Sequence, residues 1–160
     1  MVLLNSGSLR AETETKIVRV SFEIEPVTVM KVASNLGVGA VRLGPISPRA
    51  EVPSQALEVS ILTNTHHSYQ VYHRLEGEIS NAEGAKFPSE KILFMVTRGK
   101  EGGNSEFPGS IPVPTDETLI FRSKPEGGSD TFQVVYSVEN TKLFEAGLYY
   151  GNIYFDIRTE

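Results

Sequence analysis

Apolar and polar residues alternate along most of this chain with a period of two. The pattern is clearest at residues 16–25, KIVRVSFEIE, where an apolar row is interleaved with arginine, serine and glutamate. The apolar row consists of Val18, Val20, Phe22 and Ile24. Because successive side chains of a β-strand point to opposite faces, this alternation predicts a strand with one apolar face.

Six further segments have the character of extended strands. They are residues 27–32, 55–64, 91–98, 118–123, 131–138 and 148–158. Glycine and proline clusters separate most of them, and these residues supply the backbone angles that turns require. The continuous apolar run at 91–98 is typical of a central strand buried on both faces. No dozen residues show a 3.6-residue period, so we expect at most a short helical turn at 141–146.

These elements together predict an all-β fold, an immunoglobulin-like β-sandwich of about seven to nine strands. A closed barrel is the alternative architecture. Residues 1–15 are expected to form a flexible arm or the remnant of a secretion signal, and residues 16–160 a single sandwich domain. A chain of 160 residues is long enough to bury one core of this kind.

Composition narrows the classes of function. The net charge is −5, which disfavours proteins that bind nucleic acids or anionic membranes through clustered lysine and arginine. No run approaches the roughly 20 apolar residues of a membrane-spanning helix. The chain has no cysteine, so disulfides, thiolate zinc sites and cysteine nucleophiles are excluded.

All three histidines fall within residues 64–74, NTHHSYQVYHR, which raises the question of a metal site. If a strand begins near Ser68, His67 and His73 share a face but lie about 20 Å apart along it. Two ligands at that separation cannot close one zinc site, because Zn–N bonds are only about 2 Å long. We therefore expect His66 and His67 at an exposed strand end, and His73 half-buried.

No motif of a nucleophilic hydrolase, a P-loop or a dinucleotide-binding turn is present. Acidic residues such as Asp116 and Glu117 lie in expected loops, where solvated surface charge is the ordinary explanation. No calcium-loop spacing occurs among them. The sequence thus predicts a protein that is not an enzyme, with no catalytic, cofactor-binding or metal-binding residues.

Three tyrosines are candidates for an interaction surface. Tyr72, Tyr150 and Tyr154 fall opposite the expected core rows of their strands, and a row of tyrosines can stack on sugar rings or contact a protein. The alternative is that these rings only stabilise the sheet as cross-strand pairs. The long glycine- and proline-rich segment at 99–114 is either a flexible loop or a binding loop.

A family resemblance enters through four strand sequences. They are LEVSILTNT and SYQVYHRLEG, expected to form a hairpin over residues 57–75, and FQVVYSV and EAGLYYGNIYFDIR, with a corner at Ala146-Gly147-Leu148-Tyr149. The pattern resembles secreted bacterial immunoglobulin-like modules, above all pilin-type and spore-coat-U-like subunits. The resemblance implies a structural, non-enzymatic subunit of a surface fibre, fimbrium, coat or adhesin at an extracellular or cell-surface location. Its partners would be further copies of itself, as a homo-polymer, or another surface subunit.

Assembly of such subunits by strand exchange gives residues 16–25 a role. The strand can pair within its own sandwich, or insert into a neighbour with Val18, Val20, Phe22 and Ile24 filling the neighbour's groove. Insertion from head to tail does not close on itself and so yields a filament. The other hypothesis is a carbohydrate- or ligand-binding module that uses the tyrosine face and the loop at 99–117.

Overall fold

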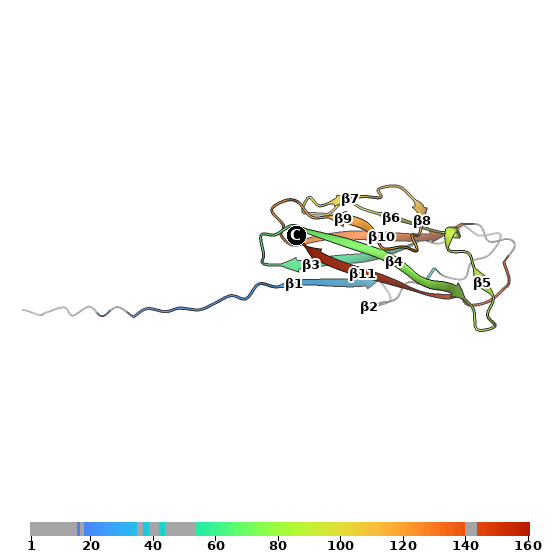
Figure 1. Ribbon diagram of the computed structural model, residues 1–160, viewed down its shortest axis with the longest axis horizontal. Helices are drawn as coiled ribbons and strands as arrows, with labels where there is room; N and C mark the ends of the chain where they lie inside the picture. Colours follow the sequence, from blue (N-terminus) through green and yellow to red (C-terminus); the bar gives the residue numbers. More distant parts are fainter. Residues whose placement is uncertain (1–15, 17, 35–36, 39–41, 44–53, 140–143) are drawn as a thin grey trace, which may run out of the picture.

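Two antiparallel β-sheets pack on one another in the computed structural model of this protein (Figure 1). The structure describes residues 16, 18–34, 37–38, 42–43, 54–139 and 144–160. Seven of the described strands have five residues or more: β1 (Thr28–Ser34), β3 (Gln55–Thr63), β4 (Tyr69–Ser80), β6 (Ile92–Val96), β9 (Thr118–Arg122), β10 (Asp130–Val138) and β11 (Tyr150–Thr159). The predicted all-β sandwich is confirmed.

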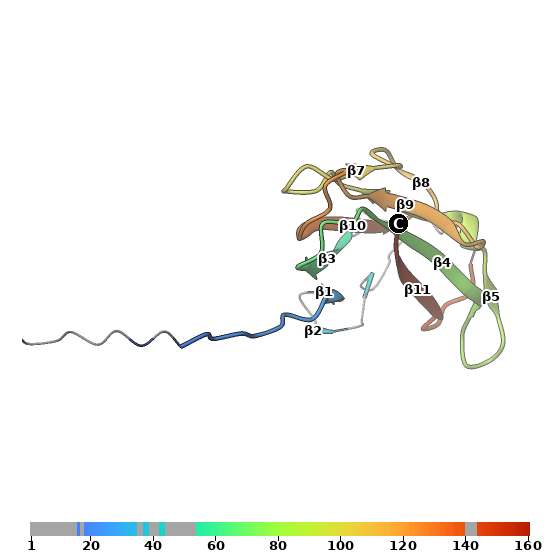
Figure 2. The same ribbon diagram turned by 60° about the vertical axis from the view of Figure 1, so that its left-hand side comes forward.

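Four strands of two residues and one 3-10 turn complete the described elements. They are β2 (Gly37–Val38), β5 (Lys86–Phe87), β7 (Asn104–Ser105), β8 (Ile111–Pro112) and η1 (Ser89–Lys91). The first sheet has the order β2-β1-β3-β10-β6-β8, and the second has the order β11-β4-β9-β7, with β5 paired to β4. From β3 onward, consecutive long strands alternate between the two sheets (Figures 1 and 2).

The core forms because each long strand buries one of its two faces. On β4 the odd-numbered residues Tyr69, Val71, His73 and Leu75 are all buried, as the alternation predicts. On β10 the even-numbered residues from Phe132 to Val138 are buried in the same way. The rows of the two sheets meet between the layers, where the rings of Phe121 and Phe132 stack 4.0 Å apart.

His73 lies within this core and not at its edge, so the expectation of a half-buried side chain is wrong. Its Nε2 atom is hydrogen-bonded to the hydroxyl of Tyr136 at 2.8 Å, across the gap between the sheets. The imidazole stacks on Phe94 and meets the edge of Phe155. Burial lowers the pKa of His73 to about 4, because the apolar surroundings disfavour the charged form.

Four other details differ from the sequence expectations. No strand forms over residues 18–27. Strands β3 and β4 belong to different sheets, so residues 57–75 cross the sandwich and do not form a hairpin. Only Phe94 and Val96 of β6 are fully buried, because these alternate side chains face the core whereas Leu93 and Met95 lie on the other face of the sheet. Residues 144–146 are not helical, and the rest of the predicted helical turn lies outside the described residues.

The corner that leads into β11 is fixed by Tyr149. Its hydroxyl donates a hydrogen bond to the backbone carbonyl of Glu145 at 2.9 Å, and its ring packs against Phe87. A tyrosine that bonds to its own backbone a few residues upstream is a feature of immunoglobulin-like sandwiches. Beside it, a side chain at Gly147 would come within 2.8 Å of the amide nitrogen of Asn81. The corner therefore needs both the small residue and the hydroxyl.

We predict that Tyr149→Phe lowers the free energy of unfolding by about 1 kcal/mol, because it removes one hydrogen bond and keeps the ring. Urea unfolding followed by circular dichroism measures this, and an unchanged midpoint would contradict the role of the hydroxyl. Tyr150→Phe is the matched control, since the Tyr150 side chain is exposed, and we expect it to leave stability unchanged.

Protonation of His73 should destabilise the fold in acid. The unfolded chain takes up this proton near pH 6.5 and the folded chain only near pH 4. The stability due to neutral His73 is therefore complete above about pH 6.5 and is lost as the pH falls toward 4. The loss at pH 4 amounts to roughly 3 kcal/mol.

Unfolding free energies at pH 7 and pH 4 test this. His73→Gln should weaken the pH dependence by that amount, whereas the exposed pair changed together, His66→Asn and His67→Asn, should leave it as in the natural chain. Identical pH dependence in the natural chain and His73→Gln would show that His73 does not titrate in this way.

Candidate assembly site

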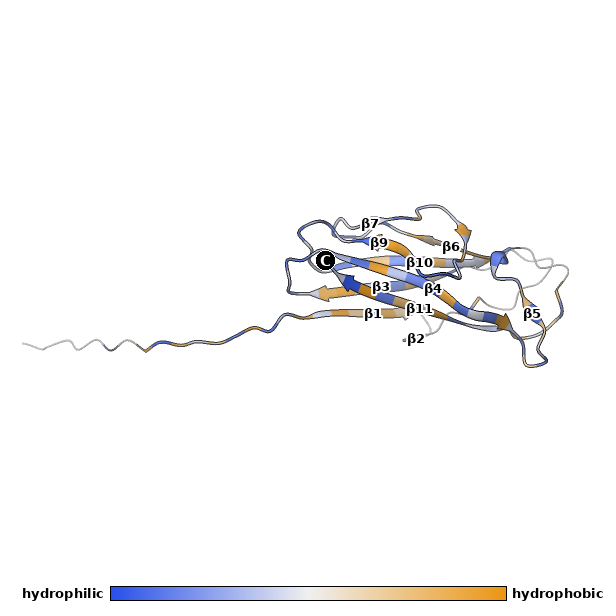
Figure 3. Ribbon diagram, in the orientation of Figure 1, coloured by the Kyte–Doolittle hydropathy of each residue, from blue (hydrophilic) through white to orange (hydrophobic). Residues whose placement is uncertain are grey.

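Residues 18–27 extend away from the sandwich (Figures 1 and 2). From here on, the arm means these residues and not the segment 1–15. The arm is extended but belongs to neither sheet, so residues 18–25 of the predicted strand pair with no strand in the described part of the chain. The four side chains of its alternating apolar row are exposed: Val18 82%, Val20 82%, Phe22 83% and Ile24 73%. Figure 3 shows hydrophobic and hydrophilic residues mixed along the arm. An apolar strand face thus stands in solvent.

The base of the arm is held by one side chain, Asn64, which follows β3. Its Oδ1 accepts a hydrogen bond from the backbone N–H of Val27 at 2.7 Å, and its Nδ2 donates to the carbonyl of Glu25 at 2.9 Å. The backbone N–H of Asn64 also donates to the carbonyl of Val27 at 3.2 Å. These bonds fix where the arm leaves the sandwich. These three hydrogen bonds of Asn64 are called here the clamp. The sequence gives no signal for the clamp, because an asparagine after a strand is usual in any turn.

His66 and His67 lie beside this clamp. Together with Ile24, Pro26, Asn64 and Thr65 they line an open hollow at the base of the arm. Both histidines are exposed, as the sequence predicts, and both stand apart from the buried His73. Among the residues that the structure describes, no three histidine, aspartate or glutamate side chains gather in a way that would hold a metal ion.

Strand β11 is the long edge of the sandwich. In the described part of the chain it pairs with β4 alone, whereas the other sheet ends are the two-residue strands β2, β7 and β8. On its inward face Ile153, Phe155 and Ile157 pack against the core but are only partly buried. Met30 and Val32 of β1 are partly buried in the same way. An unpaired backbone edge next to incompletely covered apolar residues can accept another strand.

The tyrosine candidates lie on the outer face of the second sheet. The guanidinium group of Arg158 is 4.3 Å from the ring centre of Tyr72, and that of Arg74 is 4.7 Å from the ring centre of Tyr154. A side-chain hydrogen bond with Glu76 raises the pKa of Tyr154. A sugar that stacked on these ring faces would have to displace the arginines. This arrangement favours sheet stabilisation through cation–π contacts.

Tyr150 is separate from this cluster. It lies opposite Ser80 at the start of β11 and is 63% exposed. A β-bulge falls between Tyr150 and Asn152, so the strand changes register there. The three tyrosines therefore share a sheet face, but only Tyr72 and Tyr154 carry a stacked arginine.

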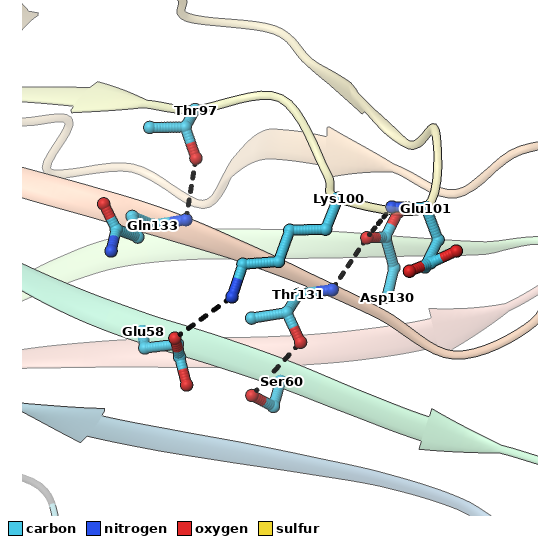
Figure 4. A network of polar contacts seen from close by, with 8 residues as sticks. All are labelled: Glu58, Ser60, Thr97, Lys100, Glu101, Asp130, Thr131 and Gln133. Atoms are coloured by element: carbon cyan, nitrogen blue, oxygen red, sulfur yellow. Dashed lines mark hydrogen bonds and ion pairs between the residues drawn. The ribbon is translucent and has the colours of Figure 1, made fainter.

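The segment at 99–114 is organised by hydrogen bonds and carries β7 and β8. The buried carboxylate of Asp130 accepts hydrogen bonds from the backbone N–H groups of Glu101 and Gly103, both at 2.9 Å. Figure 4 shows this turn above the outer face of the first sheet, where Lys100 pairs with Glu58 at 3.6 Å. In the second sheet β9 and β4 lie between β7 and β11, so this segment and the edge β11 do not form one site.

None of the described segments is a helix long and apolar enough to cross a membrane.

Comparison with known proteins does not identify a family for this chain. No family model matches the sequence, and no curated protein matches it. Among solved structures, a family 123 glycoside hydrolase from Clostridium perfringens, described for glycolipid glycan hydrolysis, aligns with 68% of this chain and 18% of its own. The TM-score is 0.38 with 11% identity, which carries no argument about fold or activity.

Proposed function

We propose that this protein is a non-enzymatic structural subunit of a surface fibre, pilus or coat, which assembles when the arm of one copy pairs with the sandwich of the next. One observation carries the proposal: four apolar side chains at alternate positions stand exposed on an extended segment that has no strand partner among the described residues. A surface location, extracellular or on the cell, belongs to the same proposal and rests on the resemblance to pilin-type subunits.

The free energy for assembly comes from covering the arm. Burying a valine, isoleucine or phenylalanine side chain contributes about 1.5–3 kcal/mol relative to leaving it exposed. Backbone pairing along a sheet edge adds hydrogen bonds and fixes the register. Exposed apolar rows of this kind mark interaction surfaces in soluble proteins.

The position of the arm favours a partner in another molecule. Asn64 anchors Glu25 and Val27, so the apolar row begins just beyond a fixed point and extends away from its own sandwich. An arm held in this way presents its apolar face to a neighbour. Because the arm and its acceptor are different surfaces, the contact is head to tail and generates a filament.

We predict that Phe22→Glu weakens self-association at least tenfold, because it puts a charge in the middle of the apolar row. Ser21→Glu introduces the same residue one position away, on the opposite face, and we expect it to assemble nearly as well as the natural chain. Light scattering over a range of concentrations gives the association, and negative-stain microscopy shows whether fibres form. Equal loss in both variants would contradict the one-sided role of the apolar row.

Removal of residues 1–25 is the second test. The sandwich starts at β1, so we expect the shortened chain to remain folded by circular dichroism and to be monomeric. A folded, shortened chain with the same assembly state as the full chain would overturn the proposal, and so would a natural chain that stays monomeric at millimolar concentration.

A further inference from the structure

We propose that the acceptor of the arm is the free edge of β11 in the next copy, paired antiparallel with Arg19 opposite Asp156. This inference rests on the proposed assembly and specifies its partner surface. It concerns which edge receives the arm, in which direction, and in which register.

Length and exposure select the edge. β11 runs over ten residues, Tyr150–Thr159, and the apolar row of the arm spans seven, from Val18 to Ile24. The other described ends of the sheets are strands of two residues, and the longest neighbouring edge that they leave uncovered is the five residues 28–32 of β1. At the β8 end, Pro112 has no N–H to donate. Of these edges, β11 alone can pair with the whole apolar row.

Direction follows from where the strands begin and end. β1 begins opposite Thr63, and β11 ends beside Ser68, where the N–H of Glu160 donates to the Ser68 carbonyl. The arm therefore leaves the sandwich at the end where β11 finishes, and β1 and β11 run in opposite directions (Figure 1). When copies repeat along the axis of the arm with one polarity, each arm meets the β11 of the next copy antiparallel. All strand pairs among the described residues are likewise antiparallel.

Face and register are linked, because directly opposite residues in an antiparallel pair point to the same side. The apolar row of the arm must lie on the inward side, beside the partly buried row of β11. With Arg19 opposite Asp156, the inward pairs are Val18–Ile157, Val20–Phe155, Phe22–Ile153 and Ile24–Gly151. Ile24 then lies opposite Gly151, which is the only one of these four β11 residues without a side chain.

Charge separates this register from its neighbours. A shift of two residues one way places Arg19 opposite Arg158, and like charges directly opposite destabilise a sheet. A shift of two the other way places Arg19 opposite the uncharged Tyr154, and its charge then has no directly opposite carboxylate. The register with Arg19 beside the exposed Asp156 brings opposite charges together on the outer face.

Engineered cysteines test the pairing cleanly, because the chain has none of its own. The proposed register places Glu23 opposite Asn152, and both are exposed. The variant with Glu23→Cys and Asn152→Cys should form a ladder of intermolecular disulfides on mild oxidation, since directly opposite strand residues lie within the Cα separation that a disulfide spans. The control with Glu23→Cys and Pro112→Cys, at the β8 edge, should stay largely uncrosslinked. Adding Phe22→Glu to the first variant should remove the ladder.

Each outcome separates this inference from the proposed function. Fibres that form normally but crosslink through position 112 and not 152 would overturn β11 as the acceptor while leaving arm-mediated assembly intact. Faster crosslinking of Glu23→Cys to Tyr154→Cys or Tyr150→Cys than to Asn152→Cys would contradict the register. A disulfide formed within single chains would overturn pairing between copies. A natural chain that does not assemble contradicts the proposed function itself.

Discussion

The structure depends on the requirement that each strand cover one apolar face. In the sandwich this is met between the sheets, where inward rows from β3, β4 and β10 interdigitate and the ring of His73 bonds to Tyr136 across the gap. The same requirement is unmet in the arm, whose alternation is as regular as that of any core strand. The arm is a strand by pattern, and we propose that its cover comes from another copy of the chain.

The strand order explains why two parts of the described chain, the arm and the outer edge of β11, are left without a strand partner. Consecutive long strands alternate between the sheets from β3 to β11, so each sheet is assembled from segments distant in the sequence. The last strand arrives beside β4 with one backbone edge unpaired among the described residues, on the same side of the sandwich as β1 (Figures 1 and 2). An uncovered strand at one end of the chain and an unpaired edge at the other are complementary features, and Asn64 sets the geometry between them by fixing the root of the arm.

Period-two alternation was enough to predict the strands and the core row of β4 from the sequence. It could not predict which strands share a sheet, because that depends on contacts between distant segments, as the crossing from β3 to β4 illustrates. It also could not tell that residues 18–27 lack a partner, since alternation identifies an apolar face but not what covers it. The depth of His73 was underestimated because its neighbours across the gap, Phe94 and Tyr136, come from other parts of the chain. The arginine on Tyr154 is its direct cross-strand neighbour and the arginine on Tyr72 is a diagonal neighbour, so both contacts depend on the register of β4 and β11.

Hydrogen exchange of the arm amides in the assembled protein tests the central claim most directly. A backbone N–H that pairs with another strand is protected from exchange, whereas one in solvent is not. The account predicts that arm peptides exchange freely in dilute monomer and become protected at high concentration, together with peptides from β11 and without added protection in β7 or β8. Arm amides that exchange as fast in the assembly as in the monomer would contradict it.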